Sequence, residues 1–263
     1  MKKNYRTLSY LTIFPVLALL LSGMLASCKK DSTTDNSVGS NVRLIINNLS
    51  PDVYPVRLYI NNVVQNSTST GTVLPGLQTY ATYKYNTPSN YFAVKSSGYP
   101  LQIRSTRTVD SVLFNVTDTL KSNTSYTLFV SGFLSNNSLT PILTTDYTVG
   151  DAAAIPSHGN GKLRYVNATL KTAPGAGYDV YANGTRIFNN IIYTGVSKFV
   201  EMPAGTYDLK FVNTGANVNT SSNVLITLPR ITIQDGHLYT LYSNGVVGRT
   251  DSAAVGAGII TNL

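Results

Sequence analysis

The sequence predicts an all-β protein built from two tandem β-sandwiches. Short runs rich in β-branched and aromatic residues, such as VRLYI and YTLYS, are separated by turn signals at short intervals. Beyond residue 27 no stretch sustains the apolar spacing of a helix. The strand pattern of the first half returns in the second, and each copy has about 100 residues, the usual size of an immunoglobulin-like sandwich.

Residues 1–27 have the pattern of an export signal. Three basic residues lie within the first six positions, and a mostly apolar run follows over residues 8–24. Pro15 and Gly23 interrupt this run, so its helix-compatible part falls short of the ~20 residues that a spanning helix needs. We therefore expect a signal peptide rather than a membrane span.

Cys28 is the only cysteine of the chain and follows this signal directly. The sequence Leu25-Ala26-Ser27-Cys28 resembles the bacterial lipobox, which implies cleavage before Cys28, a diacylglyceryl thioether and an added N-acyl chain such as palmitate. Stable anchoring needs more than one acyl chain, and this group supplies that number. We expect a lipoprotein of the cell envelope, anchored at the outer membrane. The sequence does not decide between the periplasmic face and the cell surface. The alternative is a stray thiol after an ordinary signal.

Polar residues from 28 to 40 are expected to form a flexible tether between the anchor and the folded part.

The remaining chain shows one plan twice. The first copy, module 41–147, contains VRLIINNLSPDVYPVRLYINN, and the second, module 162–263, begins KLRYVNATLKTAPGAGYDVYANG. An Ala-, Gly- and Pro-rich stretch, residues 148–161, is the expected linker. The positions expected to correspond are Asn47 and Asn167, Tyr59 and Tyr181, Tyr91 and Tyr207, and Tyr126 and Tyr239.

Turn residues locate the strand ends within each copy. Asn183-Gly184 between YDVYA and TRIF predicts a hairpin, because a type I′ turn needs positive φ at both central residues. Asn61-Asn62 is its weaker counterpart. Tyr239, after an Asp-Gly turn, suits a tyrosine corner, in which the phenol bonds to backbone upstream. Tyr126 takes the same place in the first copy.

These motifs resemble a family called domain of unknown function 4397. The resemblance rests on the opening RLIINNLSP, on P-A-G-x-Y-x-L at residues 203–209 and on Y-T-L in the later strand. It covers both copies, although the second has no Ser-Pro where the first has Ser50-Pro51. It implies tandem immunoglobulin-like modules on bacterial envelope and secreted proteins, and no established activity.

The composition argues against several classes of function. The net charge is +8, but only 12% of residues are charged and the basic ones are scattered, which makes nucleic acid a poor partner. Nucleophilic catalysis has only His158 and His237 as bases, and no G-x-S-x-G elbow occurs. Two histidines and one lipidated cysteine give zinc no ligand set. We expect no enzyme activity, no metal and no cofactor.

Tyrosine is the one enriched interacting residue, with 18 copies and no tryptophan. Tyr83 and Tyr85 are two positions apart, so on a strand they share one face, where they could stack on a sugar or contact a protein. Alternatively, their rings fill a core or cover an edge strand. The first hypothesis is a non-catalytic spacer, adhesion or binding lipoprotein. The alternative is a glycan-binding accessory lipoprotein of a polysaccharide-uptake system.

Overall fold

The computed structural model describes residues 41–53, 55–65, 82–83, 91–95, 101–106, 111–117, 120–170 and 176–263. These residues belong to one compact unit, Gly39–Leu263. They form β-strands and two short 3₁₀ turns, Ala152–Ala154 and Ser221–Asn223, and the fold is all-β. In this described part, no helix is long and apolar enough to span a membrane.

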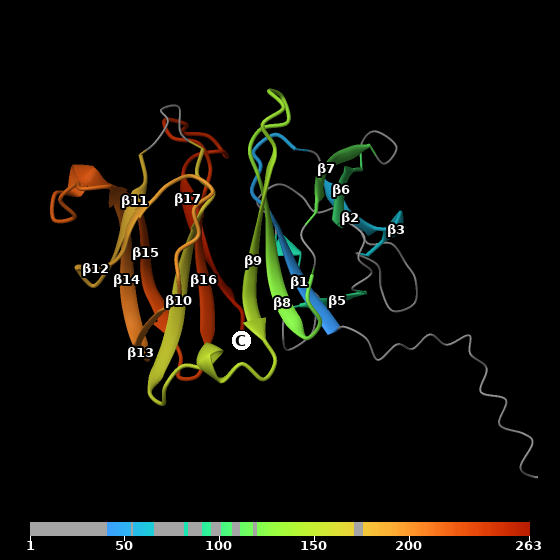
Figure 1. Ribbon diagram of the computed structural model, residues 1–263. Helices are drawn as coiled ribbons and strands as arrows, with labels where there is room; N and C mark the ends of the chain where they lie inside the picture. Colours follow the sequence, from blue (N-terminus) through green and yellow to red (C-terminus); the bar gives the residue numbers. More distant parts are fainter. Residues whose placement is uncertain are drawn as a thin grey trace, which may run out of the picture. The chain divides into compact units, whose positions relative to one another are not determined.

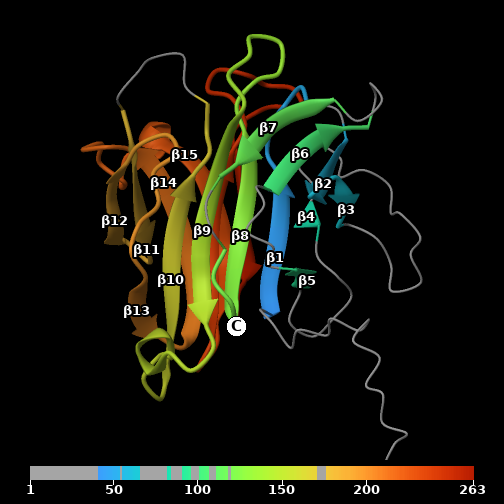
Figure 2. The ribbon, with the colours of Figure 1, turned by 45° about the vertical axis from the view of Figure 1, so that its right-hand side comes forward.

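The first sandwich consists of two sheets (Figure 1). Its inner sheet contains β4 (Thr82–Tyr83), β5 (Phe92–Lys95), β1 (Asn41–Asn48), β8 (Thr124–Ser131) and β9 (Thr140–Thr148). Its outer sheet contains β3 (Val63–Val64), β2 (Val56–Ile60), β6 (Leu101–Ser105) and β7 (Val112–Val116). Figure 2 shows β6 and β7 in a layer separate from β1 and β8.

The second sandwich repeats this arrangement. Its inner sheet contains β13 (Val200–Pro203), β10 (Asn160–Asn167), β16 (Leu238–Asn244) and β17 (Gly256–Thr261). Its outer sheet contains β12 (Thr185–Ile191), β11 (Tyr178–Ala182), β14 (Gly205–Asn213) and β15 (Val224–Ile233). The two inner sheets face each other, so each outer sheet lies on the far side of its own sandwich (Figure 1).

Strand registers align the two copies residue by residue. β1 runs parallel to β8 with Leu44 opposite Tyr126, and β10 runs parallel to β16 with Leu163 opposite Tyr239. The neighbouring strands extend the alignment on both sides. Equivalent pairs are therefore Ile45 and Arg164, Asn47 and Val166, Asn48 and Asn167, Tyr91 and Phe199, Thr127 and Thr240, and Asp146 and Asn262.

The registers change two of the expected correspondences. Asn167 matches Asn48, because each side chain accepts a hydrogen bond from the backbone N–H two residues ahead, at 3.3 Å in Asn48 and 3.0 Å in Asn167. Asn47 instead takes the place of Val166. Tyr91 matches Phe199, since Tyr207 lies in β14 of the outer sheet. Matching by residue identity missed a shift of one position, which in a strand moves a side chain to the other face.

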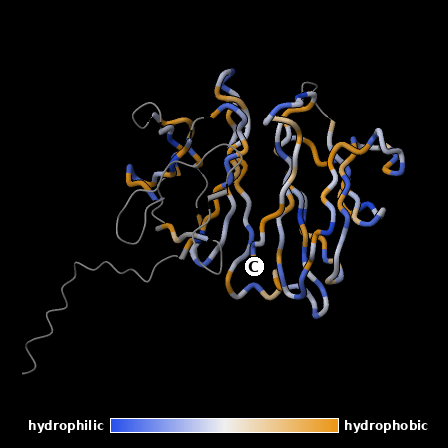
Figure 3. Tube along the Cα trace, turned by 180° about the vertical axis from the view of Figure 1, so that it is seen from behind, coloured by the Kyte–Doolittle hydropathy of each residue, from blue (hydrophilic) through white to orange (hydrophobic). Residues whose placement is uncertain are grey.

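Each sandwich has its own apolar core between its two sheets. Alternating residues of β2 and β6 pack against residues of β1 and β8 in the first, and β11 and β14 pack against β10 and β16 in the second. Figure 3 shows orange, hydrophobic stretches alternating with blue ones along these strands. A third cluster, including Ile45, Phe129, Val166 and Ile260, joins the two inner sheets.

The predicted turns and corners have definite geometry. Asn183 and Gly184 have φ of 47° and 84° between β11 and β12, and Asn61 and Asn62 have φ of 48° and 60° between β2 and β3. Tyr126 Oη accepts a hydrogen bond from the backbone N–H of Lys121 at 2.9 Å. This is the geometry of a tyrosine corner.

The corresponding corner in the second sandwich has the same sequence separation. Tyr239 Oη accepts from the backbone N–H of Gln234 at 3.1 Å, five residues upstream as in the first copy. Each phenol therefore fixes the chain segment that enters the penultimate strand of its sandwich.

The connection between the sandwiches packs onto the second one. Glu201 accepts from the backbone N–H of Ser157 at 3.0 Å, and Asp235 accepts from that of Gly159 at 2.8 Å. The Lys162 ammonium donates to the carbonyl of Ala153 at 2.7 Å. These contacts hold residues 153–159 of the connection against the second sandwich.

Candidate functional site between the two sandwiches

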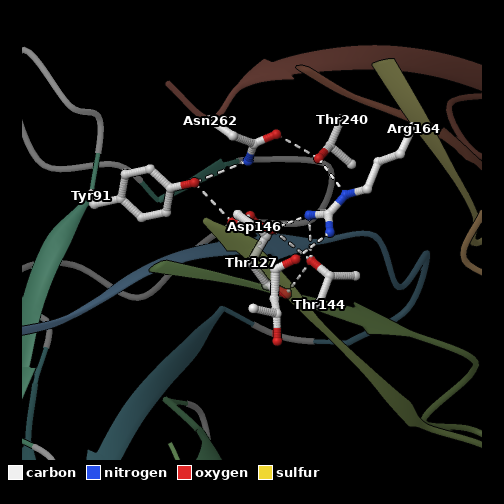
Figure 4. Close-up of polar contacts among 8 residues, drawn as sticks. Tyr91, Thr127, Thr144, Asp146, Arg164, Thr240 and Asn262 are labelled. Carbon is white, nitrogen blue, oxygen red and sulfur yellow. Dashed lines mark hydrogen bonds and ion pairs between the residues drawn. The ribbon is translucent and has the colours of Figure 1, made fainter. Parts of the chain in front are cut away.

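A buried ion pair joins the two sandwiches (Figure 4). Arg164 lies on β10 and Asp146 near the end of β9, and their side chains are 4% and 0% exposed. The Arg164 guanidinium donates to the Asp146 carboxylate through Nη2. Arg164 also packs over the Phe199 ring, 4.8 Å from its centroid. A charge this deeply buried needs a partner, and each residue supplies the other's.

All three nitrogens of the Arg164 guanidinium donate hydrogen bonds. Nη1 donates to the carbonyl of Thr145 at 2.6 Å, and Nη2 donates to Thr144 Oγ1 at 2.8 Å. Nε donates to Thr240 Oγ1 at 2.9 Å. Two of these three partners belong to β9, so one side chain of the second sandwich is hydrogen-bonded to a strand of the first.

A β-bulge directs Asp146 into this interface. The register of β8 and β9 shifts between Ser125 and Tyr126, which leaves Asp146 as the extra residue. Its Oδ2 accepts from Tyr91 Oη at 2.8 Å and from Thr127 Oγ1 at 2.6 Å. Its Oδ1 accepts from Thr144 Oγ1 at 2.9 Å. The carboxylate is therefore fully hydrogen-bonded as well as paired.

The second copy contributes a neutral counterpart. Asn262 occupies the position equivalent to Asp146, and its Oδ1 accepts from Thr240 Oγ1 at 2.6 Å as Asp146 accepts from Thr127. Its amide nitrogen donates to Tyr91 Oη at 3.0 Å. Ile45 stands at the place equivalent to Arg164, so the first copy has no counterpart of that arginine and the two copies share a single Arg164–Asp146 ion pair.

Tyr91 bridges the two halves of this network. Burial raises the pKa of its phenol well above the ordinary value, and the nearby charge of Asp146 raises it further. The phenol therefore stays protonated, donating to Asp146 while accepting from Asn262. Because its hydrogen-bond donors and acceptors are fixed, the network suits a structural role in joining the two sandwiches.

Apolar and polar contacts continue along the interface. The Phe129 and Tyr242 rings lie 5.8 Å apart between centroids, and both belong to the cluster shared by the inner sheets. At another point Ser131 Oγ donates to the carbonyl of Ala168 and lies 3.2 Å from Tyr193 Oη. The two sandwiches are joined by these apolar contacts as well as by the ion pair.

The eight carboxylates in the described residues all serve as hydrogen-bond acceptors for the fold. Asp179 is the most buried besides Asp146, and it accepts from the backbone N–H groups of Asn190 at 2.8 Å and Gly215 at 3.2 Å. The other six, which accept from backbone N–H groups of neighbouring turns and loops, are Asp52, Asp151, Glu201, Asp208, Asp235 and Asp251.

The predicted site residues lie partly outside the described chain. Cys28 and Tyr85 are outside the described residues, and so is the side chain of Tyr83. His158 is an exposed residue with Nδ1 3.7 Å from Asp235 Oδ2, and His237 Nδ1 lies 2.7 Å from the carbonyl of Asp235. Among the described residues, the contacts of these two rings include no hydrogen bond to a side-chain hydroxyl. In the part of the chain with described structure, no group of three metal-ligating residues occurs.

Sequence reasoning did not identify the ion pair. Arg164 stands within an apolar strand, KLRYV, and this unusual position was the available signal, because a charge on a buried strand requires a partner. The partner was not predictable, since Asp146 reaches the interface only through its bulge.

Comparison with known proteins agrees with the resemblance stated above. Residues 169–257, within the second sandwich, match the model of a family described as Domain of unknown function (DUF4397). No curated protein matches the chain.

Two solved structures illustrate how distant the structural neighbours are. One is a CBM26 module from Eubacterium rectale Amy13K in complex with maltoheptaose, with 11% identity, coverage of 83% of this chain and 95% of that one, and a TM-score of 0.23. The other is a putative cell adhesion protein from Bacteroides uniformis ATCC 8492, with 9% identity, coverage of 83% and 96%, and a TM-score of 0.17. Scores this low carry no argument about function.

Proposed function

We propose that the protein is a non-catalytic lipoprotein of the cell envelope, anchored through acyl chains on Cys28, whose two sandwiches form one rigid module for binding or adhesion. The observation that carries this proposal is the buried interface between the sandwiches. A buried, hydrogen-bonded ion pair and a shared apolar cluster hold the copies together, whereas a flexible linker alone would let them move independently.

The use of carboxylates supports a role without catalysis. General acid–base chemistry needs a titratable group that can reach a substrate. The carboxylates described above are committed to backbone N–H groups or to arginine, and Asp146 and Asp179 have no exposed side-chain surface. Their hydrogen bonds give these carboxylates structural roles in turns, loops and the interface.

Rigidity can be measured directly in the Cys28→Ser background. Cysteines introduced at Val63 in β3 and Asn189 in β12, both exposed, carry one spin label on each outer sheet. We expect a single narrow distance distribution by electron–electron double resonance. A broad distribution that spans many separations would contradict a rigid module.

The anchor requires a separate experiment in the producing bacterium. Wild-type protein should incorporate labelled palmitate and sediment with membranes, and the Cys28→Ala protein should do neither. A Cys28→Ala protein that still carried label and remained membrane-bound would rule out the proposed anchor. Protease treatment of intact cells then assigns the face of the membrane.

The alternative is a glycan-binding accessory lipoprotein of a polysaccharide-uptake system. Tyr83 and Tyr85, on which this idea first rested, lack described side chains. A different surface favours it, because Arg57 and Arg104 lie opposite each other on β2 and β6 in the outer sheet of the first sandwich.

A further inference from the structure

The outer sheet of the first sandwich has an arginine-rich face. Leu58 of β2 and Ile103 of β6 point into the core. Because side chains alternate along a strand, Arg57, Tyr59 and Arg104 point to the opposite side, away from the core. This set, with Gln102 and Asn115 beside it, is termed the arginine face.

The two arginines of this face lie directly opposite each other. Arg57 and Arg104 are cross-strand partners in the register of β2 and β6. Like charges in this position repel each other and destabilise the pair. Both Nε atoms are buried and have no hydrogen-bond partner, and the ion pairs found among the described residues involve other side chains. Among the described residues, no carboxylate pairs with either arginine.

Arg104 is held in one orientation. Its guanidinium carbon lies 4.3 Å from the centroid of the Tyr59 ring. Its Nη2 donates to Gln102 Oε1 at 2.5 Å and also to Asn62 Oδ1. Stacking and hydrogen bonds therefore fix the Arg104 guanidinium over Tyr59, and a pre-positioned donor binds a ligand at a lower entropic cost.

The second sandwich shows that the fold does not require these arginines. Aligned through Tyr59 and Tyr181, its outer sheet has Asp179 and Val212 where the first has Arg57 and Arg104. Asp179 is fully buried and hydrogen-bonded. The arginine pair is therefore a property of the first copy alone, and a structural need common to both copies does not explain it.

We infer that the arginine face binds a carboxylate-bearing polysaccharide. A guanidinium matches a carboxylate through two parallel N–H···O bonds, and arginines on neighbouring strands can both contact one acidic sugar chain. The amides of Gln102 and Asn115, opposite each other on β6 and β7, can hydrogen-bond sugar hydroxyls. This inference deepens the binding role proposed above and rests on it.

The same observations disfavour an anionic membrane as the ligand. Recognition of acidic headgroups by electrostatics uses clusters of about four to eight basic residues. The arginine face has two, together with neutral amides, on one sheet. A small site with few charges and several amides suits one acidic sugar better than a charged surface.

The test measures binding of trigalacturonate to the full-length protein in uncharged detergent micelles by calorimetry. Wild type should bind trigalacturonate, with weaker affinity at higher salt, and should not bind neutral maltotriose. Arg57→Gln/Arg104→Gln should weaken binding by about tenfold or more, because it removes charge-assisted hydrogen bonds. The matched control Lys198→Gln/Lys210→Gln removes the same charge from the second sandwich and should keep binding within about twofold of wild type, since both lysines lie outside this face.

A second variant separates binding from folding. Arg57→Glu places an acid opposite Arg104, as the second copy has an acid in the equivalent strand position, so the protein should melt no lower than wild type while losing trigalacturonate binding. Equal weakening by both double variants would show a general charge effect and overturn the inference. So would absence of trigalacturonate binding, or binding only to phosphatidylglycerol vesicles. None of the three variants changes Cys28, so a failure of membrane attachment would be seen separately from a failure of trigalacturonate binding.

Discussion

The two sandwiches share one topology but use charge differently. At the inner sheets, the first copy has Ile45 and Asp146 where the second has Arg164 and Asn262, so each copy supplies half of one ion pair. At the outer sheets, the second copy buries a hydrogen-bonded acid at Asp179, whereas the first displays paired arginines. The two copies thus diverge at the interface between them and on their outer sheets, while their hairpin turns and tyrosine corners stay alike.

The largest expected effect comes from giving the second copy the residue of the first. Arg164→Ile leaves the Asp146 carboxylate buried without its cation, which should cost about 3–5 kcal/mol of unfolding free energy. Urea unfolding measures the loss. Adding Asp146→Asn removes the stranded charge and makes the two copies alike at both positions, so the double variant should recover to within about 1 kcal/mol of wild type.

This pair of variants also tests the origin of the loss. If Arg164→Ile/Asp146→Asn is as unstable as the single variant, packing around Ile rather than the unpaired carboxylate accounts for the cost. A recovery in the double variant would establish that the charges serve specificity between the copies more than net stability.

The next effect concerns the acid of the second outer sheet. Asp179→Ala leaves the backbone N–H groups of Asn190 and Gly215 without acceptors, and should destabilise by about 2–4 kcal/mol in urea unfolding. Its matched control is Arg57→Ala at the equivalent site of the first copy, expected within about 0.5 kcal/mol of wild type. Comparable losses in both variants would refute the contrast drawn between the outer sheets.

A smaller, stabilising effect is expected at Asn47. Its side chain is fully buried and neither polar atom has a hydrogen-bond partner, whereas the equivalent residue of the second copy is Val166. Asn47→Val should raise the unfolding free energy by about 1–2 kcal/mol, because it removes buried unsatisfied groups. Asn48→Val is the control, and should lower stability because Asn48 accepts from the backbone N–H of Ser50.

The sequence predicted much of the fold and little of the site, for a physical reason. Turns such as Asn183-Gly184 and corners such as Tyr239 are local, since their partners lie within a few residues. The ion pair joins residues of different copies, and Asp146 faces the interface only because the bulge shifts the strand register. The arginine face likewise depends on Arg57 in β2 lying opposite Arg104 in β6, although the two residues are 47 positions apart in the chain.

The smallest expected effect is a pH dependence specific to the first sandwich. Asp52 accepts from the backbone N–H groups of Leu134 at 2.7 Å and Ser135 at 3.0 Å, which ties its loop to the turn between β8 and β9. Although partial burial acts to raise the pKa of Asp52, the hydrogen bonds from Ser135, Leu134 and Ser50 hold it below the ordinary 3.8.

A depressed folded-state pKa means that the unfolded chain binds the proton more tightly. The contribution of Asp52 is therefore present above the unfolded pKa of 3.8 and is lost as pH falls through the lower folded value. Urea unfolding from pH 6 down through this range should show a shallower acid loss in Asp52→Asn than in wild type. Identical pH profiles for the two proteins would mean that this loop contact contributes nothing in solution, and that the copies differ only in their sheets.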